Sequence, residues 1–418
     1  MDQSCILVKG GKRLCGEIKV QGSKNTVLPI MAASLLAEGK TVIHGCPKIQ
    51  DVYDMIAVLQ AIGSRIYWEG HTLILDNSGN IESHISDGRA GGFRASSLLM
   101  GALLSRNGSV SIEKPGGCQI GKRPLNYHFQ GFEQLGANVL EQDGRYECRC
   151  KRLSGSWICL PFPSVGATEN LMLAATRASG VTVITGCARE PEICDLSYFL
   201  RKMGIKTEGA GTSVIKIWGK NKINPVEYDV PYDRIVAATY LFAAMMTEGN
   251  IILDLNEDTY RLENILSIIE EIGGRVIRRP RQIEIRMKGR MKPFEIKTGP
   301  HPGVPTDIQS MLMTAALKSK GPSLIVENIF ESRFAVCEEL ENMGGRIMID
   351  KNRAFVIPVK RLRGTSVTAK DLRGGAALIL AGLWAEGETM IRSCGYVKRG
   401  YEDIVGCLSH LGAQIQEM

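Results

Sequence analysis

A loop that is rich in glycine and proline carries the side chain best suited to proton transfer, the thiol of Cys118. The loop runs from Lys114 to Pro124 and places Lys114, Lys122 and Arg123 around the cysteine. Neighbouring cations lower the pKa of a thiol toward neutrality, where the group can act as a general acid or as a nucleophile. A buried structural cysteine is the alternative, and the polar composition of the loop argues against it.

The sequence Gly22-Ser23-Lys24-Asn25 opens an apolar segment that is expected to be a helix running to Leu36. Ser23 is a suitable N-cap, which leaves Lys24 in the first turn. Free backbone amides, the positive end of the helix dipole and an ammonium group then lie together, which suits a phosphate or a carboxylate. A lysine at a helix start is more often simply solvated, so this feature alone does not establish a site.

Asp307 is the candidate for a general base. It follows a segment from Thr298 in which three prolines should fix the backbone, and it precedes an apolar helix. A carboxylate in this place is more commonly just a favourable charge at a helix N-terminus. Convergence of arginines from loops near repeat boundaries would mark a binding site. Four arginines stand in or beside such loops: Arg94, Arg333, Arg373 and Arg399.

Composition limits the classes of protein that the chain can be. With 418 residues, of which 44% are hydrophobic and 23% charged, it can bury sizeable cores in two or three domains. The 12 cysteines are scattered without regular pairing, so reduced thiols are expected rather than a disulfide scaffold. Cys148 and Cys150 form a Cys-x-Cys pair without a second pair or a histidine cluster, so no metal site and no cofactor are predicted.

The charge and the apolar runs indicate a cytoplasmic protein that binds small molecules. The formal net charge of +7 fits small anions, and no dense basic block points to nucleic acid or a membrane surface. The N-terminus lacks the apolar core of a secretory signal. The longest apolar run, Ile235–Met246, covers 12 residues. A membrane-spanning helix needs about 20.

The candidate residues are spread over an internal repeat. Six apolar stretches, rich in alanine and leucine, each end at a glycine, at positions 39, 108, 180, 249, 321 and 387. The spacings between these glycines are 69, 72, 69, 72 and 66 residues, so six repeats nearly fill the chain. A second glycine follows a leucine, isoleucine or methionine in every repeat: Gly63, Gly136, Gly204, Gly273, Gly344 and Gly412.

Each repeat is expected to alternate helices and strands. A short β-branched run follows the first glycine, and apolar residues then recur at helical intervals, as in Val52, Met55, Ile56, Leu59 and Ile62. The second glycine suits a helix C-cap that needs positive φ, and a short strand resumes after it. Such repeats can build a solenoid, but units with their own strands and helices favour closure into two compact domains of three repeats each.

Seven short motifs, in order along nearly the whole chain, resemble those of the UDP-N-acetylglucosamine 1-carboxyvinyltransferases. They are Ser23-Lys-Asn25, Pro115-Gly-Gly-Cys118 through Arg123-Pro124, Ser164-Val-Gly-Ala-Thr168, Ala188-Arg-Glu-Pro-Glu192, Pro300-His-Pro302 through Pro305-Thr-Asp307, Arg333-Phe334 and Arg399-Gly-Tyr-Glu402. The cysteine loop makes the resemblance specific, because it separates this family from the related shikimate-pathway enzymes.

The resemblance implies an α/β fold, the inside-out α/β barrel, in which two domains each contain three βα repeats. Residues 22–230 would form the first domain with the cysteine loop, and residues 1–21 with 231–418 would form the second with Asp307 and Arg399. The family places its active site between the domains and uses the cysteine loop as a lid. The implied reaction transfers the enolpyruvyl group of phosphoenolpyruvate to the 3-hydroxyl of UDP-N-acetylglucosamine and releases phosphate, at the first committed step of peptidoglycan synthesis.

Position by position, the resemblance assigns roles to residues of this chain. Cys118 would protonate C3 of phosphoenolpyruvate and Asp307 would take the proton of the sugar hydroxyl, with Lys24, Asn25 and Arg399 completing the catalytic set. Phosphoenolpyruvate would be bound by Lys24, Asn25, Arg123 and Arg399. UDP-N-acetylglucosamine would be bound by Arg94, Arg123, Pro124, Leu125, Asn126, Tyr127, Ser164, Val165, Gly166, Asp307 and Ile329. Supporting roles would fall to Arg333, Asp371 and Arg373.

Three positions depart from the pattern of the best-known members. Asn126 stands where many have aspartate, Tyr127 where many have leucine, and Phe162 where some have lysine. All three lie near the expected uridine or diphosphate contacts, so they bear on nucleotide affinity rather than on the chemistry.

Three other functions stay open at this point. One is a catalytically idle paralogue that binds UDP-sugar and regulates the pathway. Another is a shikimate-3-phosphate enolpyruvyl transferase, which should lack the cysteine loop. A nucleic-acid binder, suggested by the pI of about 8.7, would show steep salt dependence, although no basic stripe with interleaved aromatic residues is present in the sequence.

Overall fold

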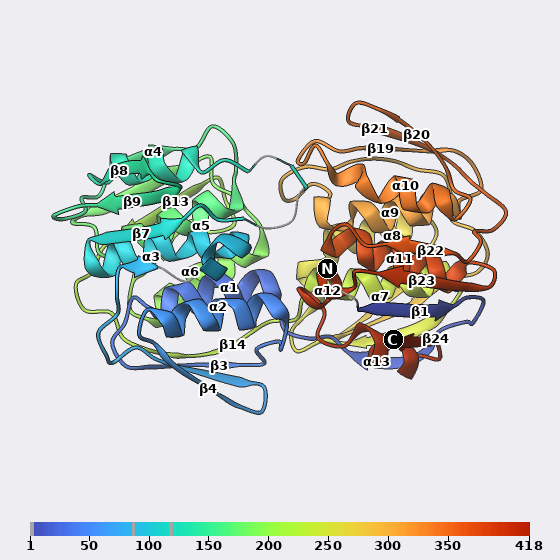
Figure 1. The fold of residues 1–418 in the computed structure, drawn as a ribbon, viewed down its shortest axis with the longest axis horizontal. Coiled ribbons are helices and arrows are strands. Elements are labelled where there is room, and N and C mark those ends of the chain that lie inside the picture. The colour runs from blue at the N-terminus through green and yellow to red at the C-terminus, as the bar shows by residue number, and fades with distance from the viewer. Residues whose placement is uncertain (1–3, 86–87, 117–119, 122) are drawn as a thin grey trace. The chain divides into compact units, whose positions relative to one another are not determined.

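The computed structural model describes residues 4–85, 88–116, 120–121 and 123–418, which fold into two compact units. The first unit runs from Gly22 to Pro231, and the second joins the chain up to Gln21 to residues Tyr232–Met418. Both ends of the chain therefore belong to the second unit (Figure 1). The described loop residues Ile120 and Gly121 also group with the second unit.

Three repeats of one pattern, β-α-β-α-β-β, build the first unit. The first repeat contains α1 (Lys24–Ser34), β3 (Lys40–His44), α2 (Gln50–Ala61), β4 (Arg65–Glu69), β5 (Thr72–Asp76) and, from the far end of the unit, β14 (Glu227–Asp229). The second contains β6 (His84–Ile85), α3 (Leu98–Asn107), β7 (Ser109–Glu113), α4 (Asn126–Gln134), β8 (Asn138–Gln142) and β9 (Arg145–Arg149). The third contains β10 (Trp157–Cys159), α5 (Val165–Ala175), β11 (Val181–Thr185), α6 (Pro191–Lys202), β12 (Lys206–Glu208) and β13 (Val214–Trp218).

The second unit repeats the pattern three more times. Its first repeat contains β2 (Cys15–Lys19), α7 (Arg234–Met246), β15 (Asn250–Asp254), α8 (Glu263–Glu271), β16 (Arg275–Arg279) and β17 (Gln282–Arg286). Its second contains β18 (Glu295–Lys297), α9 (Gln309–Leu317), β19 (Ser323–Val326), α10 (Val336–Asn342), β20 (Arg346–Asp350) and β21 (Arg353–Ile357). Its third contains β22 (Ser366–Thr368), α11 (Leu372–Trp384), β23 (Glu388–Arg392), α12 (Gly395–Lys398), α13 (Ile404–His410), β24 (Gln414–Glu417) and β1 (Cys5–Lys9).

Every repeat contributes one four-stranded sheet with the same strand order. In the sheet β18-β19-β21-β20, the first two strands are parallel and the remaining neighbours are antiparallel. In the last sheet, β22-β23-β1-β24, the N-terminal strand β1 pairs with β23 and β24 and takes the place of a hairpin strand. Strand β2 pairs in parallel with β15. The N-terminal segment therefore completes two sheets of the second unit.

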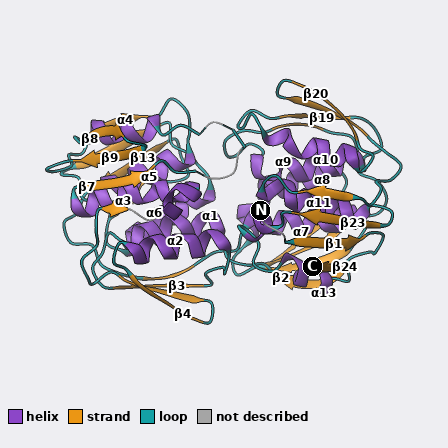
Figure 2. Ribbon diagram, in the orientation of Figure 1, coloured by secondary structure: helices purple, strands orange, loops and turns teal. Residues whose placement is uncertain are grey.

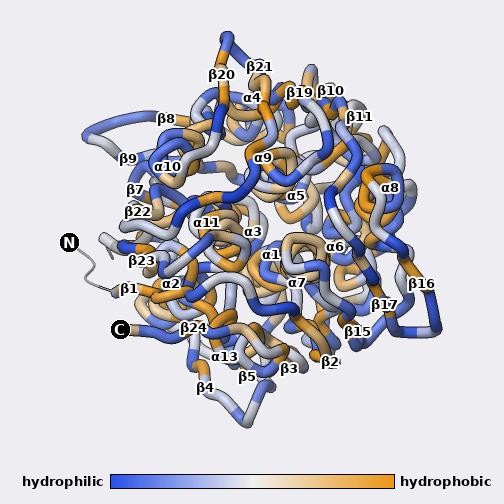
Figure 3. The backbone as a smooth tube through the Cα atoms, turned by 90° about the vertical axis from the view of Figure 1, so that its right-hand side faces the viewer, coloured by the Kyte–Doolittle hydropathy of each residue, from blue (hydrophilic) through white to orange (hydrophobic). Residues whose placement is uncertain are grey.

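The helices lie inside each unit and the sheets outside (Figure 2). All 13 residues of α7 and all 13 of α11 are buried, because these helices are apolar on every side. The strands bury alternate residues, as β1 does with Ile6 and Val8, and hairpin ends such as that of β16–β17 are hydrophilic (Figure 3). This arrangement confirms the expected fold class. No helix in the described ranges has the length and apolar character needed to cross a bilayer.

The second glycine of each repeat ends a helix with positive φ, as the spacing predicts. Its φ lies between 89° and 110° in all six repeats, at Gly63, Gly136, Gly204, Gly273, Gly344 and Gly412. Residues other than glycine rarely adopt this backbone conformation. The apolar stripe of α2 is buried at Val52, Met55, Ile56 and Leu59, so the helical periodicity is confirmed as well.

Candidate active site

The buried helices of the first unit point the same way. Arg106 at the end of α3 donates Nη1 to the carbonyl of Leu35 at 2.6 Å, and Arg177 after α5 donates Nη2 to the carbonyl of Leu36 at 2.8 Å. The C-terminal ends of α1, α3 and α5 are thus held together by cations. Because these helices have 11, 10 and 11 residues, their N-termini emerge together at the opposite end, where the helix dipoles are positive.

Lys24 stands at the first of these N-termini. The hydroxyl of Ser23 accepts a hydrogen bond from Thr26 N at 3.2 Å, so Ser23 caps α1 as predicted. Lys24 Nζ lies 2.5 Å from Asp51 Oδ2 in the first turn of α2, and these side chains are 12% and 5% exposed. Asn25 follows in the same turn and is half-buried. Asp51 therefore orients the ammonium group, which is not simply solvated.

Arg94 and Arg123 meet at the second N-terminus. Arg94 lies in the 3-10 turn Arg94–Ser97 before α3 and donates Nη2 to the carbonyl of Pro124 at 3.5 Å. Burial, followed by the nearby charge of Arg123, lowers the pKa of Arg94 to about 10. A second guanidinium group close enough to lower the pKa of Arg94 makes this a favourable place for an anion.

The place where Arg94 and Arg123 meet, before α3, is called the Arg94 corner below. Two buried residues that the sequence analysis missed, His128 and Asn170, support this corner. The side chain of Asn170 on α5 makes three contacts. Its Nδ2 lies 2.8 Å from Nδ1 of His128 on α4 and donates to the carbonyl of Ser97 at 2.8 Å. Its Oδ1 accepts a hydrogen bond from Gly101 N at 2.7 Å. Burial, and then the charge of Arg94, lowers the pKa of His128 to about 3, so the imidazole is neutral. An amide within the apolar run of α5 was the signal that could have found this pair.

The N-terminus of α5 adjoins the same corner. Ser164 caps the helix and accepts from Ala167 N at 3.4 Å, and Val165 and Gly166 begin it. A Cβ added to Gly166 would lie 3.6 Å from His128 Cε1, so this helix start lies against the supporting histidine. The remaining residues of the first-unit nucleotide set follow the Arg123 segment: Leu125 is buried, Tyr127 is half-buried, and Pro124 and Asn126 are exposed. Phe162, two residues before the Ser164 cap, is 40% exposed.

In the second unit, two arginines converge on Asp307, which lies in the 3-10 turn Thr306–Ile308 before α9. Arg333 Nη2 lies 2.6 Å from Oδ1 and Arg373 Nη2 lies 3.2 Å from Oδ2. Arg333 also reaches Asp371, with 3.7 Å between Nη1 and Oδ1, and Asp371 caps α11 through Arg373 N at 2.9 Å. The convergence that would mark a site is therefore present for Arg333 and Arg373.

The electrostatics keep Asp307 ionised. Burial raises the pKa of this carboxyl, but the charges of Arg373 and Arg333 outweigh burial and hold the pKa well below its ordinary value. The side chain is still 29% exposed, so it can meet a ligand. Arg373 Nη1 is buried and has no acceptor within the described part of the chain. A ligand oxygen would satisfy this donor.

Ile329 and Arg399 are placed by residues that the sequence did not single out. Glu327 accepts from Ile329 N at 2.8 Å and from the hydroxyl of Thr306 at 3.0 Å, which ties the Ile329 turn to the turn of Asp307. Arg399 follows α12, and Gln21 holds the segment after it. Gln21 Nε2 donates to the carbonyl of Gly400 at 3.1 Å, and its Oε1 accepts from Glu402 N at 2.8 Å.

The cysteine loop is described only in part, and Cys118 and Lys122 lie outside the described residues. Lys114, one of the cations expected to influence the thiol, pairs with Glu141, with 2.5 Å between Nζ and Oε1. Its ammonium also lies 5.8 Å from the centre of the Tyr146 ring. Ile120, within the loop, accepts a backbone hydrogen bond from Ser332 at 3.0 Å, next to Arg333.

Comparisons with known proteins show the family of the chain. Residues 8–408 match the family described as EPSP synthase (3-phosphoshikimate 1-carboxyvinyltransferase). The chain is 43% identical over 411 residues to UDP-N-acetylglucosamine 1-carboxyvinyltransferase 2 of Caldanaerobacter subterraneus, covering 98% of each chain. It is 42% identical over 413 residues to UDP-N-acetylglucosamine 1-carboxyvinyltransferase of Halothermothrix orenii, covering 99% of each.

Solved structures show the same fold. The enolpyruvyl transferase NikO from Streptomyces tendae superposes with a TM-score of 0.91 at 24% identity, covering 100% of this chain and 99% of that one. EPSP synthase from Acinetobacter baumannii gives a TM-score of 0.78 at 20% identity, with 100% of both chains covered. Taken with the sequence identities over nearly the full length, these findings show that the chain belongs to the EPSP synthase family and, within it, to the UDP-N-acetylglucosamine 1-carboxyvinyltransferases.

Proposed function

We propose that the protein transfers the enolpyruvyl group of phosphoenolpyruvate to the 3-hydroxyl of UDP-N-acetylglucosamine and releases phosphate, in the first committed step of peptidoglycan synthesis. Relatives at 43% and 42% identity carry the name of this activity. The structural observation that carries the proposal concerns Asp307. Its ionised carboxylate forms ion pairs with Arg333 and Arg373, and its side chain is still 29% exposed. Such a group can orient a sugar hydroxyl and accept its proton.

Phosphoenolpyruvate would be bound by Lys24, Asn25, Arg123 and Arg399. Lys24 supports this assignment because it combines an oriented ammonium with the positive end of a helix dipole. Arg123 adds its charge beside Arg94. A phosphate and a carboxylate on one small molecule need several fixed cations.

UDP-N-acetylglucosamine would be bound at the corner made by Arg94, the segment from Arg123 to Tyr127, and the start of α5 from Ser164 to Gly166. In the second unit, Asp307 and Ile329 would contact the sugar, and Arg333, Asp371 and Arg373 would fix Asp307. The hydrogen bonds of Glu327 support this grouping, because they join the turns of Ile329 and Asp307.

The chemistry would be an addition followed by an elimination. The thiol of Cys118 donates a proton to C3 of phosphoenolpyruvate, which develops positive charge at C2. The sugar 3-oxygen bonds to C2 while Asp307 takes its proton. The bond between C2 and the phosphate oxygen then breaks, and loss of a proton from C3 restores the double bond. Preorganised cations and carboxylates lower the barrier because the charges develop where these groups already lie.

The decisive experiment is phosphate release from phosphoenolpyruvate with and without UDP-N-acetylglucosamine. We expect release only with the sugar nucleotide, together with a product whose mass equals UDP-N-acetylglucosamine plus the enolpyruvyl group. Release that ignores the sugar nucleotide would contradict the proposal. Binding of the sugar nucleotide without turnover would favour the idle regulatory paralogue.

Shikimate 3-phosphate is the second candidate acceptor, because the matching family is described by that reaction. A parallel assay with this acceptor separates the two functions, and we expect no phosphate release with it. We also propose that the enzyme acts in the cytoplasm on small molecules and without nucleic acid, because both proposed substrates are phosphorylated metabolites of that compartment.

A further inference from the structure

Each four-stranded sheet ends in a parallel pair on one side and in an antiparallel pair on the other, and the six edge strands on the antiparallel side are not equally protected against pairing with another chain. These edges are β4, β8, β12, β16, β20 and β24. Natural edge strands usually carry charges that prevent such pairing. On β20, two consecutive large apolar residues are exposed, Met348 at 57% and Ile349 at 51%. The other five edges expose at most one such residue each, Tyr67 on β4 and Leu140 on β8.

The apolar surface of β20 continues onto its neighbours. Met348 pairs with Phe355 on β21, which is 40% exposed, and Phe355 pairs with the half-buried Leu324 on β19. Figure 3 shows hydrophobic segments along this hairpin below its hydrophilic tip. Ile349 projects to the opposite face because successive side chains of a strand alternate. A pairing strand would therefore find apolar contacts on both faces.

The hydrogen-bonding groups of this edge also point outward. Asp350 and Arg353 close the two-residue turn of the hairpin, and the pairs Met348–Phe355 and Arg346–Ile357 follow at intervals of two. In an antiparallel hairpin, the residues in phase with the closing pair direct their N–H and C=O groups to the partner strand. The residues between them, Ile347 and Ile349, then direct these groups to the open side.

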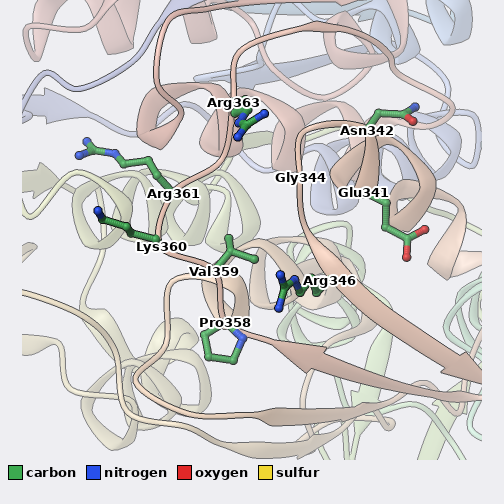
Figure 4. A pocket seen from close by; sticks show the side chains of 9 residues that line it. All are labelled: Glu341, Asn342, Gly344, Arg346, Pro358, Val359, Lys360, Arg361 and Arg363. Atoms are coloured by element: carbon green, nitrogen blue, oxygen red, sulfur yellow. The ribbon is translucent and has the colours of Figure 1, made fainter.

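A cationic pocket of about 410 Å³ lies at the base of the same hairpin (Figure 4). Four uncharged residues line it together with five charged ones, which are the cations of Arg346, Lys360, Arg361 and Arg363 and the carboxylate of Glu341. Arg361 Nε donates to the carbonyl of Trp384 at 3.0 Å and so caps α11. Arg346, Lys360 and Arg363 form no ion pair with any residue in the described ranges. Arg346 begins β20 and lies on the same face as Met348.

We propose that β20 is a docking site for an extended, acidic segment of a partner protein, which adds to the sheet as a fifth strand. Backbone bonds to Ile347 and Ile349 would hold the segment, apolar side chains would cover Met348, and carboxylates would reach the cations of the pocket. Charge complementarity favours this occupant over a second copy of the chain. The β20–β21 hairpin of a second copy carries one carboxylate, Asp350, against three cations, Arg346, Lys351 and Arg353, so it would supply far less negative charge to the pocket than an acidic segment.

The test uses the full chain and a fluorescent, end-blocked peptide of four glutamates followed by four valines, with a peptide of four lysines followed by four valines as the control probe. We expect anisotropy to report binding of the acidic peptide only, and roughly tenfold weaker binding at 0.5 M salt than at 0.05 M salt. Equal binding of both peptides, or none of the acidic one, would overturn the proposal. Growth of the particle mass with protein concentration, lost in Ile349→Pro, would assign the edge to a second copy instead.

Two variants locate the binding. Ile349→Pro removes an outward N–H at an edge position that tolerates proline, and Met348→Glu places a charge at the centre of the strand. Both should weaken peptide binding at least tenfold while turnover stays normal. Leu140→Glu is the matched control, because Leu140 is 50% exposed at the centre of the equivalent edge strand β8. Peptide binding that survives Ile349→Pro, or that is lost equally in Leu140→Glu, would show that β20 is not the site.

Discussion

The two units share one repeat architecture but differ in the residues that cap their buried helices. In the first unit, serines cap α1 and α5. In the second unit, aspartates cap α7 and α11, through Asp233 and Asp371, and Asp307 precedes α9. Serine and aspartate are equally good N-caps, so helix stability does not explain the difference. The choice instead sets the charge at the end of each helix bundle.

The charge of the N-cap residues makes the helix N-termini of the two units suited to different chemistry. The neutral caps of the first unit add no negative charge to the positive helix ends, and Arg94 and Arg123 add positive charge there, while Lys24 is paired with Asp51. This end is suited to anions. In the second unit, the aspartates are balanced by buried arginines, so a carboxylate remains available beside cations that hold it in place. The proposed reaction needs both kinds of site.

The largest expected effect concerns the proposed acid, which belongs to the loop of the first unit. Cys118→Ser replaces a titratable thiol with a hydroxyl that is far too weak to donate, so turnover should collapse by at least about 10²-fold. Cys118→Asp restores a proton donor and should keep activity with an optimum at lower pH. Steady-state rates between pH 5 and 9 check both variants. An unchanged rate for the serine variant would remove Cys118 from the mechanism.

Next in size is the proposed base in the second unit. Asp307→Asn keeps the shape of the side chain and one of its two acceptor oxygens but cannot take a proton, so kcat should fall about 10²-fold or more. UDP-N-acetylglucosamine should still bind, as calorimetry would show. Because the pKa of Asp307 is held below its ordinary value, the acid limb of the wild-type pH profile should not come from this residue. Near-normal turnover of the variant would leave Asp307 with a structural role only.

The third prediction tests whether cations from both units serve one substrate. Arg399→Ala should raise the KM for phosphoenolpyruvate about tenfold or more, since a charge-assisted contact is lost, and should change the KM for the sugar nucleotide much less. Initial rates with each substrate varied in turn make the comparison. Equal increases for both substrates would indicate general damage to the second unit.

The fourth prediction exchanges the cap chemistry itself. Ser23→Asp gives α1 the kind of cap that α7 and α11 have, so the melting temperature should stay nearly unchanged. The added negative charge beside Lys24 should raise the KM for phosphoenolpyruvate about tenfold, because it opposes an anion at close range. Ser23→Asn is the matched control, with the same shape and no charge, and should leave that KM within about twofold. Similar constants for the two variants would show that cap charge does not matter.

Much of the fold could be predicted from the sequence because the repeat marks its own boundaries. The helix-ending glycines need positive φ, and the apolar stripe of α2 has a clear period, so these features are local. The Ser23 cap followed from residue types at a helix start in the same way.

The supporting residues of the site could not be predicted, because they act across long sequence separations. Gln21 holds a backbone segment at Gly400 and Glu402, and Asn170 joins Ser97 to His128. Gln21 has no local pattern that distinguishes it from an ordinary polar residue, and for Asn170 the only local signal is an amide within the apolar run of α5. The expected influence of Lys114 on the Cys118 thiol stays a prediction, because Cys118 lies outside the described residues, and the ammonium of Lys114 pairs with Glu141.

The smallest expected effect concerns His128, which as a neutral imidazole adds no further charge to the proposed anion-binding site beside Arg94. Burial and the charge of Arg94 lower its pKa from 6.5 to about 3 in the folded protein. Between these values the unfolded chain binds a proton that the folded one does not, so stability should fall as the pH drops below about 6.5.

His128→Gln keeps an acceptor for Asn170 Nδ2 but removes the group that titrates. It therefore isolates the contribution of His128 to the pH dependence of stability. Between pH 7.5 and pH 5.5, the free energy of unfolding of the wild type should fall by about 1 kcal/mol more than that of the variant, because a lost proton contributes at most about 1.4 kcal/mol per pH unit below its pKa. Urea unfolding at the two pH values measures this difference, and the variant at pH 7.5 shows any cost of the substitution itself. Parallel losses in the two proteins would mean that His128 carries a proton in the folded state at pH 5.5. The corner beside Arg94 would then hold three cations, and the contrast with the balanced charges around Asp307 would be larger than the structure indicates.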